Sequence, residues 1–115
     1  MGELIGVARF RFHDGKVEEY KRLSAEAMEI VRAREPGTLE YSIYFNVDES
    51  AAVVIERFRD IDALLEHGRN MAEISEQVLK TGTVEGELLG DVTAEIRANV
   101  ESGEQPKLYS PWLSK

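Results

Sequence analysis

Two hydrophobic periods alternate along the chain, and their order strongly limits the folds open to it. Two segments show the helical spacing of three to four residues, and four show the strand spacing of two. The helical segments are Lys16 to about Arg34 and Asp60 to about Thr81. The strand segments are Leu4–Phe12, Thr38–Val47, Ala52–Arg59 and Gly86–Val100. The order β-α-β-β-α-β predicts an α+β, ferredoxin-like fold, an antiparallel sheet with both helices on one face.

Residues that begin or end helices flank both helical segments. Asp14 and Asp60 are predicted N-caps, because a short polar side chain satisfies free backbone N–H groups. Pro36-Gly37 ends the first helix, since proline disfavours helical geometry at the residue before it. Gly68-Arg69-Asn70 is expected to break or kink the second helix, and Gly82 to end it.

The first and second strands divide into faces of different character. Leu4, Gly6, Ala8, Phe10 and Phe12 form an apolar or small face that is expected to meet the helices. The opposite face mixes apolar with basic side chains: Ile5, Val7, Arg9 and Arg11. A solvated face would not need Ile5 and Val7, so a partner sheet is expected there, most economically in a homodimer. In the second strand Leu39, Tyr41, Ile43, Phe45 and Val47 are expected to share one face.

The length of 115 residues suggests one domain, residues 1–100, followed by a tail, residues 101–115. The tail carries Tyr109, Trp112 and Leu113, which is too apolar for a freely solvated end. We expect the tail to dock on its own domain or on a partner.

Composition excludes several classes of protein. The net charge is −8, from 22 acidic and 14 basic residues, and this repels a phosphate backbone, so nucleic-acid binding is not expected. The chain has no cysteine, which excludes disulfides and thiolate chemistry. Apolar runs are short, so neither a membrane span nor a signal peptide is expected, and a cytoplasmic location is the default.

Four segments carry a resemblance to a known family. They are Glu35–Tyr41, Ile55–Asp60, Ala63-Leu64 and Glu66-His67. With them the chain resembles the antibiotic biosynthesis monooxygenase (ABM) domain of the dimeric α+β barrel superfamily, over about residues 4–98. The resemblance implies a homodimer whose two sheets form a barrel, with a pocket between sheet and helices in each subunit. Members include cofactor-free monooxygenases of quinol-like polyketides, haem-degrading enzymes and small proteins without an assigned role.

The resemblance also indicates what this chain lacks. Haem-degrading members place an asparagine on the first strand, where this chain has Ala8. They place a haem-ligating histidine near the end of the second helix, where this chain has residues 75–77. Both departures argue against haem degradation, and no cofactor is expected. With two histidines and no cysteine, no compact transition-metal site is expected either.

His67 and Glu56 are the candidate catalytic residues. A neutral imidazole accepts a proton from a phenol near pH 7, and the resemblance places His67 on the pocket wall. The alternative is a histidine satisfied by packing and one hydrogen bond. Glu56 lies on the strand face that would meet the helices, where a carboxylate would orient His67. The alternative is an ion pair with Arg57, Arg9 or Arg11 at the sheet surface or the dimer interface.

Five further residues are candidates for substrate binding: Tyr41, Phe10, Phe58, Met71 and Trp112. Tyr41 would offer its hydroxyl to a ligand, and Phe10, Phe58 and Met71 would form apolar walls. The alternative for these four is ordinary core packing. Tyr109 and Trp112 would cap the pocket mouth or hold the tail against a neighbour.

These observations together favour a small homodimeric barrel protein that binds an aromatic ligand. The favoured function is a cofactor-independent monooxygenase that acts on an aromatic, quinol or polyketide-like substrate, with the substrate anion as the reductant of dioxygen. One alternative is a non-catalytic dimeric binding or stress-response module. Another is an isomerase or cyclase that uses proton transfer in the same pocket.

Overall fold

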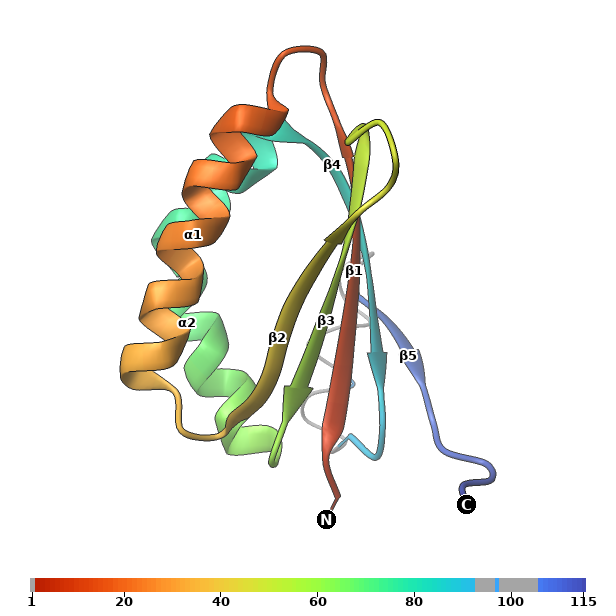
Figure 1. Ribbon diagram of the computed structural model, residues 1–115. Helices are drawn as coiled ribbons and strands as arrows, with labels where there is room; N and C mark the ends of the chain where they lie inside the picture. Colours follow the sequence, from red (N-terminus) through yellow and green to blue (C-terminus); the bar gives the residue numbers. More distant parts are fainter. Residues whose placement is uncertain (1, 93–96, 98–105) are drawn as a thin grey trace.

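The structure, a computed structural model, describes residues 2–92, 97 and 106–115. Its elements are β1 (Leu4–Phe12), α1 (Val17–Arg34), β2 (Thr38–Phe45), β3 (Ala51–Phe58), α2 (Ile61–Val78), the 3-10 helix η1 (Leu79–Thr81), β4 (Gly82–Leu89) and β5 (Lys107–Tyr109). Both α-helices cover the same face of one sheet (Figure 1). The predicted α+β, ferredoxin-like fold is confirmed.

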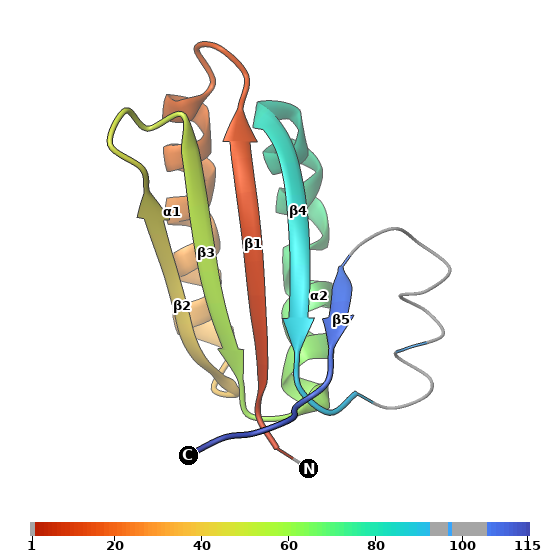
Figure 2. The ribbon, with the colours of Figure 1, turned by 90° about the vertical axis from the view of Figure 1, so that its right-hand side faces the viewer.

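The sheet has the strand order β2-β3-β1-β4-β5, with β1 in its middle (Figure 2). β1 runs antiparallel to both neighbours, so that Val7 pairs with Ile55 on one side and with Glu87 on the other. β5, from the C-terminal tail, adds to β4 in parallel, with Leu108 opposite Leu88. This part of the tail therefore joins the sheet of its own chain.

The core fills the layer between the sheet and the helices. One cluster joins α1 to α2 through Leu23, Ala27, Val31, Met71 and Ile74. A second cluster joins the other end of α2 to the sheet through Leu4, Phe58, Ala63 and Leu88. Burial of such side chains supplies roughly 1.5–3 kcal/mol each. The predicted inner face of β1 is confirmed at Leu4, which is buried in this core.

The helix ends agree with the sequence only in part. The carboxylate of Asp60 accepts a hydrogen bond from the Ala63 N–H at 2.9 Å, so this predicted N-cap is confirmed. The predicted cap at Asp14 is wrong, because Lys16 occupies the N-cap of α1 without a side-chain hydrogen bond. The predicted break at Gly68-Arg69-Asn70 is also wrong. α2 runs unbroken through it, since a helix tolerates one interior glycine when its flanks pack well.

A β-bulge in β2 changes the predicted face of that strand. Thr38 pairs with Phe58, but Glu40 already pairs with Arg57, so Leu39 is the extra residue. Leu39 is 43% exposed, whereas Tyr41 lies opposite Glu56 on the face that meets the helices. The prediction that Leu39 shares the face of Tyr41 is therefore wrong. Val47, predicted on the same face, lies beyond the end of β2 and is exposed.

The last predicted strand is displaced along the chain. β4 begins at Gly82 and ends at Leu89, whereas the sequence pattern predicted Gly86–Val100. Gly90 has a φ of 138°, which only glycine adopts readily, and the chain leaves the sheet there. Residues 93–96 and 98–100 of the predicted strand lie outside the described residues. Within the part of the chain that the structure describes, no helix is long and apolar enough to cross a membrane.

Candidate active site

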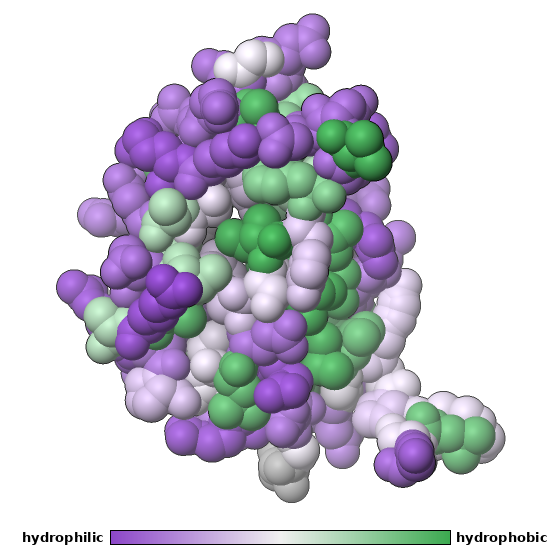
Figure 3. Space-filling view, in the orientation of Figure 1, coloured by the Kyte–Doolittle hydropathy of each residue, from purple (hydrophilic) through white to green (hydrophobic). Residues whose placement is uncertain are grey.

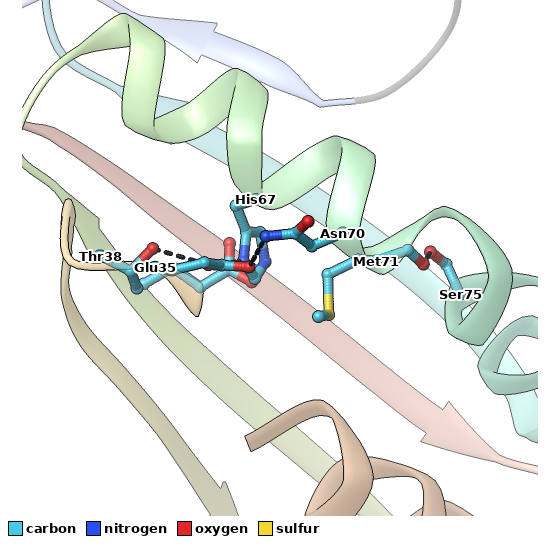
Figure 4. Close-up of polar contacts among 7 residues, drawn as sticks. Glu35, Thr38, His67, Asn70, Met71 and Ser75 are labelled. Atoms are coloured by element: carbon cyan, nitrogen blue, oxygen red, sulfur yellow. Dashed lines mark hydrogen bonds and ion pairs between the residues drawn. The ribbon is translucent and has the colours of Figure 1, made fainter. Parts of the chain in front are cut away.

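His67 lies on the inner side of α2, above the centre of the sheet (Figure 4). The Asp60 cap fixes the start of the helix, and the helical period then turns His67 toward β3. The side chain is almost enclosed, with the residue 8% exposed. Its ring packs against Phe58 at 5.3 Å and Tyr41 at 5.5 Å between ring centroids. The imidazole is therefore held in one position by two aromatic neighbours.

Each ring nitrogen of His67 faces a carboxylate. Nδ1 lies 2.7 Å from Glu35 Oε1, and Nε2 lies 3.3 Å from Glu56 Oε1. Glu35 follows the end of α1, and Glu56 lies on β3. The imidazole therefore bridges two acidic groups that approach it from opposite sides.

Glu35 is the more deeply buried of the two acids, with the residue 4% exposed. The Thr38 hydroxyl donates to its Oε1 at 2.8 Å, and the Asn70 amide donates to its Oε2 at 3.0 Å (Figure 4). The bulge in β2 turns Thr38 to the inner face, and Asn70 stands one helical turn after His67. A buried carboxylate requires such partners.

The sequence analysis did not identify Glu35, Thr38 or Asn70 as functional residues. Asn70 had a usable signal, because its spacing of three from His67 puts both on one helix face. Glu35 lies in a segment that carries the family resemblance, but no local pattern indicated its contact with His67, which spans 32 positions of the chain.

The surroundings of Glu35 and His67 shift the pKa of both groups. Burial alone would raise the pKa of Glu35, but hydrogen bonds from Asn70, His67 and Thr38 hold it below its ordinary value. Burial disfavours the charged His67, yet the hydrogen bond and charge of Glu56, and then those of Glu35, raise the pKa of the imidazole. The two neighbouring carboxylates therefore make the His67 imidazole a stronger proton acceptor than a free histidine side chain.

Glu56 faces the helices, as the position between Val54 and Phe58 predicted. Two of the three arginines weighed as alternative partners pair elsewhere. Arg57 Nε lies 3.2 Å from Glu3 Oε1, and Arg9 Nε lies 3.5 Å from Glu87 Oε1. Gly6 on β1 leaves room for the carboxylate, since a Cβ there would stand 2.8 Å from Glu56 Oε2.

A cavity of about 260 Å³ opens beside this trio, between the sheet and both helices. Five of the seven predicted site residues line it: His67, Glu56, Tyr41, Phe10 and Met71. Ala8 and Ser75, two positions where this chain differs from the haem-degrading members, line it as well. The Ser75 hydroxyl donates a hydrogen bond to the Met71 carbonyl. Hydrophobic side chains gather over the strands on the face that Figure 3 shows, beside hydrophilic ones over α1.

The other two predicted residues lie elsewhere. Phe58 is fully buried, packs against the imidazole and lines an adjoining cavity. Trp112 is 88% exposed and lines neither cavity. The fold of a single chain therefore does not bring Trp112 to the site.

Two tyrosines complete the polar part of the cavity. Burial, and next the charge of Glu56, raise the pKa of both Tyr20 and Tyr41 well above the ordinary value. Both phenols are therefore neutral at physiological pH, and each retains an O–H group able to donate a hydrogen bond.

Among the described residues, no group of three or more histidine, cysteine or acidic side chains is arranged to hold a metal ion. Glu35 and Glu56 contact opposite nitrogens of one ring and so do not converge on a common point. What the trio offers chemically is proton transfer: a carboxylate on the cavity wall, backed by an imidazole and a second carboxylate.

Solved structures of similar fold include several that cover most of this chain. MupZ from Pseudomonas fluorescens has a TM-score of 0.84 at 20% identity, over 100% of this chain and 94% of its own. A Caulobacter crescentus protein described as an antibiotic biosynthesis monooxygenase has a TM-score of 0.71 at 26% identity, over 80% of this chain and 92% of its own. SnoaB, a cofactor-independent oxygenase from Streptomyces nogalater, was crystallised as a mutant. It has a TM-score of 0.67 at 23% identity, over 82% of this chain and 94% of its own.

Sequence comparison gives the family. Among curated proteins none matches this chain significantly. The family model described as antibiotic biosynthesis monooxygenase matches residues 4–72, which carry β1 to α2 and with them Glu35, Glu56 and His67. The chain therefore belongs to the antibiotic biosynthesis monooxygenase family.

Proposed function

We propose that this protein is a cofactor-independent monooxygenase that acts on an acidic aromatic substrate of quinol or polyketide type. The observation that carries the proposal is the Glu56–His67–Glu35 chain of contacts at the wall of a mainly apolar cavity. Family membership supports an oxygenase, and the similarity in fold to SnoaB agrees with one that needs no cofactor.

The proposed reaction starts with a proton transfer. Glu56 and His67 together take the proton of a phenol or of an activated CH₂ group, and Glu35 keeps the imidazole oriented. An apolar cavity strengthens this step, since few water molecules compete for the charges. The Tyr41 hydroxyl, also on the cavity wall, donates a hydrogen bond to the resulting anion.

The substrate anion then reduces dioxygen. One electron passes to O₂, and the two radicals combine to a peroxide anion. This anion regains the proton held by the base, and the resulting hydroperoxide loses water to leave a carbonyl. A CH₂ group and O₂ thus become C=O and H₂O, so that one oxygen atom enters the substrate. The substrate is the only reductant, and the protein supplies the base and the enclosure.

Dioxygen uptake by the metal-free protein with a panel of hydroquinones and anthrones tests this proposal. We expect uptake that His67→Ala and Glu56→Gln each lower by at least about a hundredfold, the usual contribution of a general base. Glu85→Gln, the same chemical change on the opposite sheet face, is the matched control and should retain full uptake. Uptake that survives in both site variants would refute the assigned base.

We propose further that the active form is a homodimer joined through the outer faces of the two sheets. Ile5, Val7, Val53, Ile55 and Leu89 are only partly buried in the single chain, although they are apolar. A second copy of this face would cover them. Val7→Asp should then give a monomer in analytical ultracentrifugation, and a Val7→Asp protein that stays dimeric would exclude this interface.

An isomerase or cyclase is the second candidate, because an imidazole between two carboxylates can both accept and return a proton. Such an enzyme would convert its substrate without consuming dioxygen. Turnover under nitrogen that depends on Glu56 would favour it over the oxygenase.

A further inference from the structure

A second and larger cavity adjoins the first along the flank of α2, and it is open to solvent where Leu65, Gly68 and Ala72 are exposed. Its volume is about 650 Å³, and its walls come from α2 and from β1, β3 and β4. Figure 2 shows α2 running behind β4. Glu56 and Ala8 line both cavities, so that the two spaces meet at the candidate base.

The walls of the second cavity are made mainly of small and aliphatic side chains. Leu64, Leu65, Gly68 and Ala72 line it from α2, with Gly6 and Leu88 from the sheet. Beside Glu56, the charged residues that line it are Arg69 and Glu87, and the Glu87 carboxylate turns to the outer face of the sheet, where it meets Arg9. Such a space favours an apolar ligand group over a polar one.

The glycine at position 68 of α2 indicates that the second cavity has a role in binding. Glycine inside a helix costs about 1 kcal/mol relative to alanine. Packing does not require it here, since a Cβ at Gly68 would meet nothing within 4 Å. Ala72 follows one turn later on the same side of α2 and is exposed. Small residues at these two positions leave the cavity open, and at Gly68 this comes at the expense of helix stability.

The volumes of the two cavities give a second reason to treat them as one binding site. Ligand pockets usually measure about 300–1,000 Å³. The first cavity alone, at about 260 Å³, lies below that range, and the second alone does not contain His67. A ligand that reaches His67 and fills an ordinary pocket volume must therefore extend past Glu56 into the second cavity.

We propose that the two cavities form one site for an elongated, largely apolar substrate. The reactive ring lies in the first cavity beside His67 and Tyr41, its acidic group meets Glu56, and an alkyl chain or further ring fills the second cavity under Gly68. This inference rests on the proposed function for the identity of the reactive ring.

Binding of 2-naphthols that carry linear alkyl chains of increasing length tests the proposal without any need for turnover. Calorimetry should show the Kd falling with each added methylene, by up to about fourfold for a fully buried one. Gly68→Leu and Ala72→Leu should each abolish this dependence on chain length. Both should bind unsubstituted 2-naphthol within about twofold of the original protein.

Glu73→Leu is the matched control, because it places a leucine on α2 at a residue that lines neither cavity. It should leave the chain-length dependence intact. Circular dichroism of each variant checks that the helix is retained, and we expect retention because Gly68→Leu removes a helix-weakening glycine.

Three results would overturn the proposal. They are a Kd that is independent of chain length, a chain-length dependence that survives Gly68→Leu and Ala72→Leu, and a loss of dimer mass in these variants without loss of naphthol binding. The last result would make the chamber a contact between two copies of the chain. Chain-dependent binding without dioxygen uptake would instead refute the proposed oxygenase and leave the elongated site standing.

Discussion

Carboxylates lie on both sides of the sheet, in opposite settings. On the inner face Glu35 is buried and contacts His67, Thr38 and Asn70. On the outer face Glu87 meets Arg9 at 3.5 Å, with both side chains partly exposed. Water screens the outer pair, so its contribution is small, whereas the inner contacts replace water entirely. Burial therefore decides which of these polar contacts matter to stability and chemistry.

The largest difference between the faces should appear when one acid on each is removed. Glu35→Ala leaves the enclosed His67 side chain without its closest partner, and loss of one member of a buried pair costs about 3–5 kcal/mol. Glu87→Ala on the outer face should cost no more than about 1 kcal/mol. Urea unfolding of the two variants measures both values, and equal losses would contradict the comparison.

Loss of one hydroxyl on each face should show the same contrast on a smaller scale. Thr38→Val removes a hydrogen bond to the buried Glu35, and an under-satisfied buried group costs about 1–3 kcal/mol. Ser42 donates to Glu40 at 3.1 Å on the outer face, so that Ser42→Ala is the matched control. It should change the free energy of unfolding by less than about 0.5 kcal/mol. A larger loss in Ser42→Ala than in Thr38→Val would reverse the conclusion.

The pH dependence of stability should report the contact between His67 and Glu35 on the inner side of the sheet. The raised pKa of His67 stabilises the fold fully below the unfolded value of about 6.5, and this is lost as pH rises through the folded pKa. The lowered pKa of Glu35 stabilises the fold above its unfolded value, about 4.3, and this is lost as pH falls through the folded pKa. Stability from this pair is therefore greatest between about pH 4.3 and 6.5.

Urea unfolding at a series of pH values measures both limbs of that dependence. His67→Asn should remove the loss on the alkaline side. His13→Ala, which removes the other histidine of the chain, should keep it. A loss on the alkaline side that is unchanged in His67→Asn would show that another group is responsible.

The smallest effect belongs to the outer ion pair itself. A double-mutant cycle between Arg9 and Glu87 should give a coupling of about 0.2–1 kcal/mol, which 1 M NaCl removes. A coupling above that range that also persists in high salt would mean that the pair is shielded from water, as a partner sheet on this face would cause.

Local patterns in the chain determined much of the fold and part of the site. The two hydrophobic periods predicted the α+β fold, and Asp60 predicted the start of α2. Alternation along β3 put Glu56 on the inner face, and helical spacing put His67 there. These features are readable because the period of a helix or strand fixes the face that each side chain takes.

Only the tertiary structure decided which of these side chains meet. Glu35 reaches His67 across 32 positions because the end of α1 packs beside α2, and the bulge that turns Thr38 inward depends on the register between β2 and β3. Packing also kept α2 unbroken through Gly68, and Gly90 ended β4 earlier than the alternation predicted. The physical reason is that sequence periodicity determines orientation within one element, whereas contacts between elements depend on how the buried faces fit together.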